Sequence, residues 1–172
     1  MREHSAVPAA SVRFDDLLRA HQGVIRAFLR RLCKDAALAD DLAQEAFLIA
    51  HQRLADLRDP KAAKSWLFQI AYNVYAGHAR KHARRRELFE ANHGAELDAT
   101  TQPPPAGVAR DIATAMDNLS PEVRAVILMN LSYGMSHSEV AKASGLPLGT
   151  VKSHIKRGTE KLRTFLKVYE QA

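Results

Sequence analysis

Residues 136–166, SHSEVAKASGLPLGTVKSHIKRGTEKLRTFL, carry the pattern that decides the fold of the second half of the chain. Ser136 and Glu139 have the spacing of a capping box, in which each side chain bonds the backbone amide of the other residue. A short helix is therefore predicted from Ser138 to Ser144. Gly145 provides the positive φ that a tight turn usually requires. A longer helix is predicted from Leu148 to Leu166, so the stretch forms a helix-turn-helix unit.

The longer predicted helix has two different faces. Its inward positions recur at spacings of three and four, as one side of a helix does: Val151, Ile155, Gly158, Leu162 and Leu166. The other face carries Lys152, Ser153, Lys156 and Arg157. Such a helix suits the major groove of duplex DNA. A helical hairpin with a merely basic exterior is the alternative, and its cations would either read guanine edges or contact phosphates.

The helix before this unit is predicted to begin at Leu119-Ser120-Pro121, with Ser as the cap and Pro in the first turn. Its buried face is expected to consist of Val123, Val126, Ile127 and Leu131, and Gly134 is expected to end it. In the short helix, Val140 and Ala141 are expected to face inward. A small residue at 141 would let the next helix cross closely.

The first half of the chain also has helical periodicity. Three apolar stripes with three-and-four spacing begin at Phe14, Leu38 and Trp66, and Asp59-Pro60 separates the second stripe from the third. No segment has the alternation of a strand. The sequence thus predicts an all-α fold with two small helical domains, residues 12–87 and 108–170, joined by a flexible linker at 88–107 that contains three consecutive prolines and no Lys or Arg.

Charge and composition limit the possible functions. The net charge of +6 and the pI near 9.7 favour a polyanionic partner, although a solvated basic surface is the simpler interpretation. A single cysteine, Cys33, allows no intrachain disulfide, and no apolar run is long enough to span a bilayer. A soluble cytoplasmic protein is therefore expected. His78 and His82 lack a third ligand in register, so no metal, cofactor or enzymatic activity is predicted.

Basic and aromatic residues gather at the end of the third predicted helix. Arg80, Lys81 and Arg84 stand there, beside Trp66 and Tyr72 earlier in the helix. Rings on which unpaired bases stack, with cations along the backbone, suit the separation of DNA strands. In the alternative interpretation, the rings belong to the core and the arginines form a solvated helix end.

Four segments together resemble the extracytoplasmic-function sigma factors of bacterial RNA polymerase. They are DDLAQEAF at 40–47, WLFQIAYN at 66–73, Leu119-Ser120-Pro121, and GTVKS at 149–153. The resemblance covers about residues 12–87 and 108–168, in the order of that family. Gly77, His154 and Gly158 differ from the residues that are usual in that family. We expect these differences to alter promoter preference rather than to abolish function. Gly158 either leaves a small gap or permits closer packing.

The resemblance implies a role for each group of residues. Residues that would dock on the β′ clamp helices of core RNA polymerase are Asp40, Asp41, Gln44, Glu45 and Phe47. Residues that would engage the −10 element as it melts are Arg58, Lys61, Trp66, Asn73, His78, Arg80, Lys81 and Arg84, with the loop Leu57–Ala62 holding a flipped base. Residues that would meet the −35 element are Lys152, Ser153, His154, Lys156 and Arg157. The β flap and an anti-sigma factor are further implied partners.

Three other functions compete with this interpretation. A stand-alone helix-turn-helix regulator would need a dimer interface or a ligand pocket, for which the first domain has no clear signature. A sigma-like mimic would bind a partner protein without supporting transcription. An enzyme would need a phosphate loop or a nucleophile–base set, and the sequence contains neither.

Overall fold

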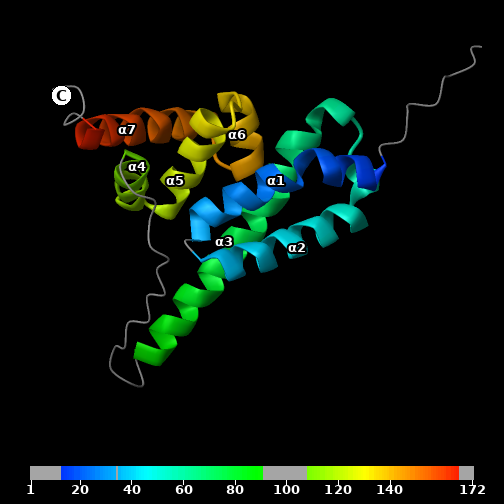
Figure 1. Cartoon of the computed structure of the whole chain (residues 1–172), viewed down its shortest axis with the longest axis horizontal. Helices are drawn as coiled ribbons and strands as arrows, with labels where there is room; N and C mark the ends of the chain where they lie inside the picture. The colour runs from blue at the N-terminus through cyan, green and yellow to red at the C-terminus, as the bar shows by residue number, and fades with distance from the viewer. Residues whose placement is uncertain (1–12, 34, 91–107, 167–172) are drawn as a thin grey trace, which may run out of the picture.

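Helices make up all the regular structure in the computed structural model, which describes residues 13–33, 35–90 and 108–166. The all-α prediction is confirmed. In chain order the elements are α1 (Phe14–Cys33), α2 (Ala36–Gln52), the 3-10 turns η1 (Leu54–Asp56) and η2 (Pro60–Ala62), α3 (Ala63–Glu90), α4 (Val108–Asp117), α5 (Pro121–Ile127), the π-helical segment η3 (Leu128–Ser132), α6 (His137–Ser144) and α7 (Leu148–Leu166), as Figure 1 shows.

The N-terminal half consists of α1, α2 and α3, which pack on one another along their apolar faces. The carboxylate of Asp35 caps α2 by accepting from the amides of Ala37 and Leu38. Asp59 caps η2 in the same way, with Pro60 in its first turn. These two caps explain the predicted breaks between the three stripes. Of the expected linker at 88–107, residues 88–90 belong to α3, and the remainder lies outside the described residues.

The C-terminal half consists of α4 to α7 and is held by local polar contacts. Ser120 caps α5, and the predicted capping box is present at the start of α6. Arg124 is buried, and its guanidinium donates to the backbone carbonyls of Met116, Asp117 and Leu119. This single side chain of α5 therefore holds the turn between α4 and α5 in place. It also satisfies carbonyl groups at the end of α4 that have no partner within the helix.

One burial prediction in this half is wrong, and another holds only in part. Leu131, expected in the core, is 56% exposed, because residues 128–132 form a π turn that changes the register of the helix. The bond from the amide of Tyr133 to the carbonyl of Leu128 closes that wider turn. In α6, Ala143 is fully buried while Ala141 is only half-buried. The glycine predictions are confirmed, since Gly134 and Gly145 both have positive φ.

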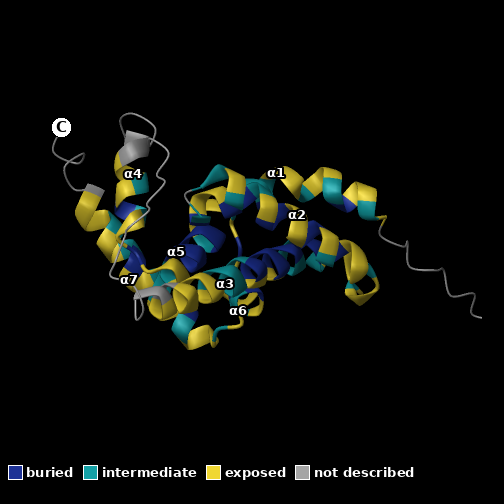
Figure 2. Cartoon of the chain, turned by 90° about the horizontal axis from the view of Figure 1, so that it is seen from below, coloured by how far each residue is buried: buried dark blue, intermediate teal, exposed yellow. Residues whose placement is uncertain are grey.

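The two halves share one continuous hydrophobic core. Helix α3 packs against α6, α1 touches α5, and the buried cluster includes residues of both halves. Figure 2 shows the buried residues concentrated where α3 passes α1, α2 and α5. Tyr133 joins the halves, because its ring centroid lies 5.8 Å from that of Phe28 in α1 and 5.1 Å from that of Phe68 in α3. Lys64 of α3 also donates a hydrogen bond to the carbonyl of Tyr133.

Candidate nucleic-acid interface

The outer face of α7 is the first candidate surface. Lys152, Ser153, Lys156 and Arg157 are all exposed, whereas Val151 and Gly158 are buried on the opposite side. The predicted division of this helix into two faces is thus present. Gly145, at φ +72°, makes the turn that brings α7 across the capped helix α6. The structure therefore presents a row of cations and a hydroxyl on one rigid, solvent-facing helix side.

His154 does not share that exposure. Its side chain is 13% exposed, and Nε2 lies 2.8 Å from a carboxylate oxygen of Glu122 in the first turn of α5. Nδ1 is buried and has no hydrogen-bond partner among the described groups. The imidazole is therefore turned sideways toward α5 rather than outward with its neighbours. Glu122 was not identified from the sequence, because nothing in its local pattern indicates a partner 32 residues away.

Gly158 lies one turn beyond His154, where α7 crosses α5 closely. A Cβ at this position would come within 2.6 Å of Cδ1 of Ile127 and 3.1 Å of a methyl carbon of Val123. Of the two possibilities that the sequence left open, the structure shows closer packing rather than a gap.

The second candidate surface lies on the outer part of α3. Asn73, Arg80, Lys81 and Arg84 are exposed, and the His78 and His82 rings stack with centroids 6.3 Å apart. Trp66 is half-buried against the core, which places it between the two interpretations that the sequence allowed. Among the described residues no group of three His, Cys, Asp or Glu side chains is arranged to hold a metal ion.

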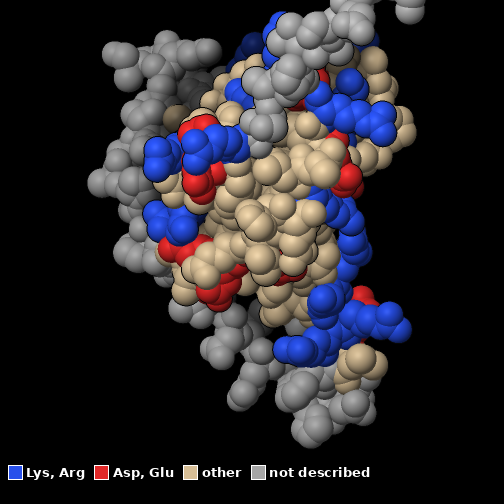
Figure 3. Space-filling model, turned by 90° about the vertical axis from the view of Figure 1, so that its right-hand side faces the viewer, with Lys and Arg blue, Asp and Glu red and all other residues tan. Residues whose placement is uncertain are grey.

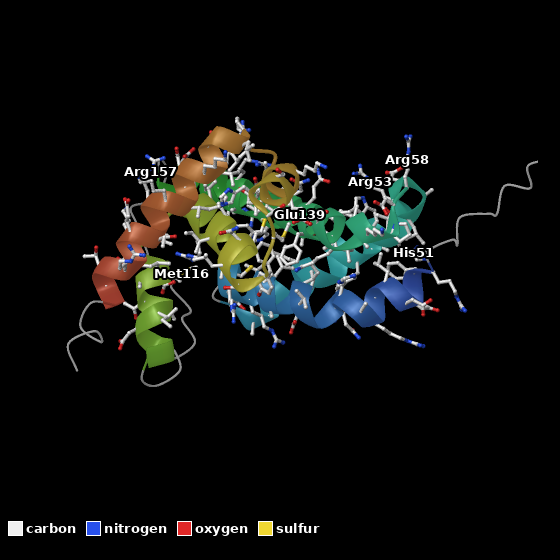
Figure 4. All side chains as sticks on the ribbon, turned by 90° about the horizontal axis from the view of Figure 1, so that it is seen from above. His51, Arg53, Arg58, Met116, Glu139 and Arg157 are labelled. Atoms are coloured by element: carbon white, nitrogen blue, oxygen red, sulfur yellow. The ribbon has the colours of Figure 1, made fainter. Side chains whose placement is uncertain are left out.

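The segment between α2 and α3 adds cations at the start of this surface. Arg58 and Lys61 are exposed in and beside η2, and the capping bond of Asp59 fixes the backbone around them. Arg53, which no motif in the sequence singled out, is also exposed and is labelled beside Arg58 in Figure 4. Figure 4 shows Arg157 at the opposite end of the molecule. Figure 3 views the side that carries this segment and shows Lys and Arg around a mainly uncharged centre.

A third surface, on α2, is acidic. Asp41, Gln44 and Glu45 are exposed, and Leu48, one turn further on, is 59% exposed. Asp40 instead joins α2 to α1, since Arg30 and Arg26 both donate to its carboxylate and these hydrogen bonds lower its pKa. Phe47, which was grouped with the docking residues, is 7% exposed and belongs to the core. Helical geometry places residue 47 about 160° around the helix from Glu45, although only about 60° from Gln44.

Comparison with known proteins identifies both halves. The model for sigma-70 region 2 matches residues 17–85, and the model for sigma-70 region 4 matches residues 109–162. The extracytoplasmic-function sigma factor SigL of Mycobacterium tuberculosis is 32% identical over 169 residues, which cover 96% of this chain and 95% of SigL. SigE of Mycolicibacterium smegmatis is 29% identical over 165 residues; these cover 92% of this chain but only 63% of SigE.

A solved structure has the same arrangement of helices. The sigma factor RpoE of Bartonella quintana, crystallised in complex with the anti-sigma factor NepR, superposes with a TM-score of 0.77 at 26% identity. The superposition covers 90% of this chain and 97% of RpoE. The identity with SigL along nearly all of both chains, together with the two region matches, shows that the chain belongs to the extracytoplasmic-function sigma factors, alternative sigma factors that direct transcription initiation by bacterial RNA polymerase.

Proposed function

We propose that this chain binds core RNA polymerase in the cytoplasm and directs it to promoters by reading a −35 element with α7 and a −10 element with α3 and the segment before it. One observation carries the proposal. The two family regions carry two separate exposed basic surfaces, with Arg58 of the first and Arg157 of the second at opposite ends of the molecule, and an acidic surface lies on α2, which precedes both in sequence. A two-element promoter needs two separate contacts of this kind.

The −35 contact is assigned to the outer face of α7. Lys152, Lys156 and Arg157 supply positive charge for the phosphates and donors for guanine edges, and the hydroxyl of Ser153 bonds to either. The short helix α6 crosses the backbone, as the first helix of such a unit does. His154 contributes to this face only indirectly, because its ring lies against Glu122 and does not point outward with the side chains of its neighbours.

The −10 contact is assigned to α3 and the turn η2. Arg80, Lys81, Arg84 and, closer to the core, His78 would hold the DNA backbone, while Asn73 offers an amide to a base edge. Arg58 and Lys61 lie at the opposite end of this surface, where the loop at 57–62 would receive a base of the melted strand. Trp66 has one side against the core and would stack or wedge against the end of the duplex.

The polymerase contact is assigned to α2. Asp41, Gln44 and Glu45 form an exposed acidic and amide face that would dock on the β′ clamp helices, and the exposed Leu48 would add apolar contact at its end. Asp40 and Phe47 support this face from beneath, one through its arginine bonds to α1 and the other through the core. The C-terminal half would contact the β flap.

Promoter binding requires the two halves to separate. Two promoter elements separated by two or more turns of duplex lie at least about 70 Å apart, at about 34–36 Å per turn. A compact chain of this length has a radius of gyration of only about 16 Å. The packing of Tyr133 between Phe28 and Phe68 must therefore open when the chain docks on the polymerase. An anti-sigma partner, such as NepR is for RpoE, would act by favouring the closed arrangement.

Run-off transcription with purified core RNA polymerase tests this function. The template carries a promoter selected from genomic fragments, and specific initiation is expected only when the chain is present. Arg157→Ala should weaken −35 recognition by about 1–3 kcal/mol if Arg157 contacts a base edge. Arg163→Ala, an exposed arginine two turns along the same helix, is the matched control and should have little effect.

Two results would contradict the proposal. Sequence-specific binding of duplex DNA by a dimer without polymerase would identify a stand-alone regulator. Tight binding to core polymerase with no initiation from any selected promoter would identify a sigma-like mimic.

A further inference from the structure

His154 has an orientation that the reading of DNA by α7 does not explain. It follows Ser153 directly and precedes Arg157 by three residues, so it lies about 60° from Arg157 around the helix. Yet its side chain is 13% exposed, and the one hydrogen bond that this side chain makes within the described part of the chain joins α7 to Glu122 of α5. With Nδ1 buried and unpartnered among the described groups, the bond from Nε2 is the one polar anchor of this side chain.

Gly158 stands four residues after His154, on the same side of α7. The absent side chain lets α7 approach Val123 and Ile127 so closely that a Cβ would meet Cδ1 of Ile127 at 2.6 Å. The next atoms that this Cβ would meet, Cγ1 of Ile127 at 3.0 Å and Cγ1 of Val123 at 3.1 Å, are fixed by χ1, at which Ile and Val are stiff, so they have little freedom to move aside. The hydrogen bond and the close crossing are thus two neighbouring contacts that fix α7 on α5 (Figure 1).

Two such contacts, one turn apart, resist rotation of α7 about its own axis. A helix with its side chains has a radius of about 5–6 Å, so a rotation of 10° moves the side-chain tips by about 1 Å. A hydrogen bond to a base edge is lost over a displacement of that size. Phosphate contacts tolerate it better, because a long flexible cation follows a diffuse charge. Rotation of α7 would therefore alter base discrimination more than overall DNA affinity.

We infer that His154 is a positioning residue: its hydrogen bond to Glu122, together with the close crossing at Gly158, sets the rotation of α7 on α5 and so selects the −35 bases that Ser153 and Arg157 reach. The inference rests on the proposed role of α7 in −35 recognition. It assigns a specificity function to Glu122, a residue of a different helix whose side chain is not part of the basic face.

The test uses the full chain with core RNA polymerase and a promoter library randomised at the −35 element. Transcripts are sequenced to give the preferred bases, and run-off assays then measure discrimination between the preferred element and a scrambled one. His154→Ala and Glu122→Ala should each lower this discrimination by about 3- to 10-fold and change the preferred bases. The double variant should be no worse than either single variant, because both remove the same bond.

Conservative variants separate positioning from simple stability. His154→Gln keeps an N–H near the position of Nε2, and Glu122→Gln keeps an acceptor oxygen, so both should retain the discrimination of the original chain. Lys152→Ala serves as the comparison for direct contact, and it should reduce transcription from all −35 sequences alike. Gly158→Ala, checked for folding by circular dichroism, should shift the preferred bases as the two alanine variants do.

Three results would overturn the inference. Loss of discrimination in His154→Ala but not in Glu122→Ala would mean that His154 contacts DNA directly. A lower melting temperature in both variants with unchanged base preference would make the pair merely structural. If no α7 variant, including Lys152→Ala, changes transcription from any library member, the proposed −35 role of α7 fails and the inference fails with it.

Discussion

The N-terminal and C-terminal halves differ in the lengths of their helices and in the side chains that fill their cores. The first half uses helices of 20, 17 and 28 residues, whose core contains large side chains such as Phe28, Leu29 and Phe68. The second half uses helices of 10, 7, 8 and 19 residues, and its fully buried positions include Val126, Val140 and Val151. Helices of seven or eight residues are marginal by themselves, so their stability must come from contacts outside the helix.

This difference determines how each half holds its exposed surface. In the first half, the polar faces of α2 and α3 are carried by long helices fixed through a deep core, so a single surface residue matters little to their orientation. In the second half, the orientation of α7 depends on a capping box, two left-handed glycines, a π turn and one glycine crossing. The ring of Tyr133 also packs the second half against the first.

The largest effect is expected from removing the ring that joins the halves. Tyr133→Ala loses ring contacts with Phe28 and Phe68, and because Tyr133 is half-buried we expect a loss of about 2 kcal/mol in unfolding free energy. The second half should then unfold before the first. Trp66, the single tryptophan, reports the first half, so its fluorescence and far-UV circular dichroism should no longer give coincident urea transitions.

Leu131→Ala is the control for this variant. Leu131 lies two residues away but is 56% exposed, so its removal should change stability by no more than about 0.5 kcal/mol. Coincident transitions in Tyr133→Ala would show that the halves remain one cooperative unit without the ring.

The contrast between the halves also explains which features the sequence could predict. Periodic stripes, caps and turn glycines are local, so the helices other than α4, the capping box at Ser136 and the turns at Gly134 and Gly145 were predicted correctly. The exposure of Leu131 was not, because the π turn is closed by bonds from the amides of Tyr133 and Met135 to the carbonyls of Leu128 and Met129, which the periodicity of the sequence does not indicate.

Long-range pairs were beyond sequence reasoning for the same reason. The bond between His154 and Glu122 joins residues 32 positions apart, and His154 was grouped with the −35 residues only through the resemblance to the sigma family. Phe47 was assigned from a motif without regard to which side of α2 it occupies. The shared core of the two halves was missed because a pattern of charges and prolines indicates a linker but says nothing of how the flanking helices pack.

A pair of glycine substitutions sharpens the comparison further. Gly145→Ala forces a Cβ onto a residue at φ +72° and should destabilise the second half by about 1–2 kcal/mol. Gly77→Ala, in the middle of α3 with nothing within 4 Å of the new Cβ, should stabilise the first half by up to about 1 kcal/mol. Thermal unfolding of both variants measures these two changes in stability. A destabilised Gly77→Ala would mean that α3 needs the glycine for bending rather than tolerating it.

The smallest effect concerns the charge in the capping box of α6. Hydrogen bonds from the backbone amide and hydroxyl of Ser136 lower the pKa of Glu139. Its carboxylate therefore stabilises the fold fully above the unfolded pKa of about 4.3, and this contribution disappears as the pH falls through the lower folded value. Glu139→Gln can keep both capping bonds, so at pH 7 its unfolding free energy should change by no more than about 0.5 kcal/mol.

The pH profile separates the capping charge from the other carboxylates. Asp40, whose pKa is lowered by Arg30 and Arg26 in the first half, titrates in both proteins and cancels in the comparison. Melting temperatures measured from pH 3 to 7 should therefore converge or cross as the pH falls through the unfolded pKa of about 4.3 toward the lower folded pKa, because Glu139 then becomes protonated in the original chain whereas residue 139 of the variant does not titrate. A constant difference at every pH would show that the charge of Glu139 contributes nothing, and that the short helix depends on the hydroxyl cap of Ser136 alone.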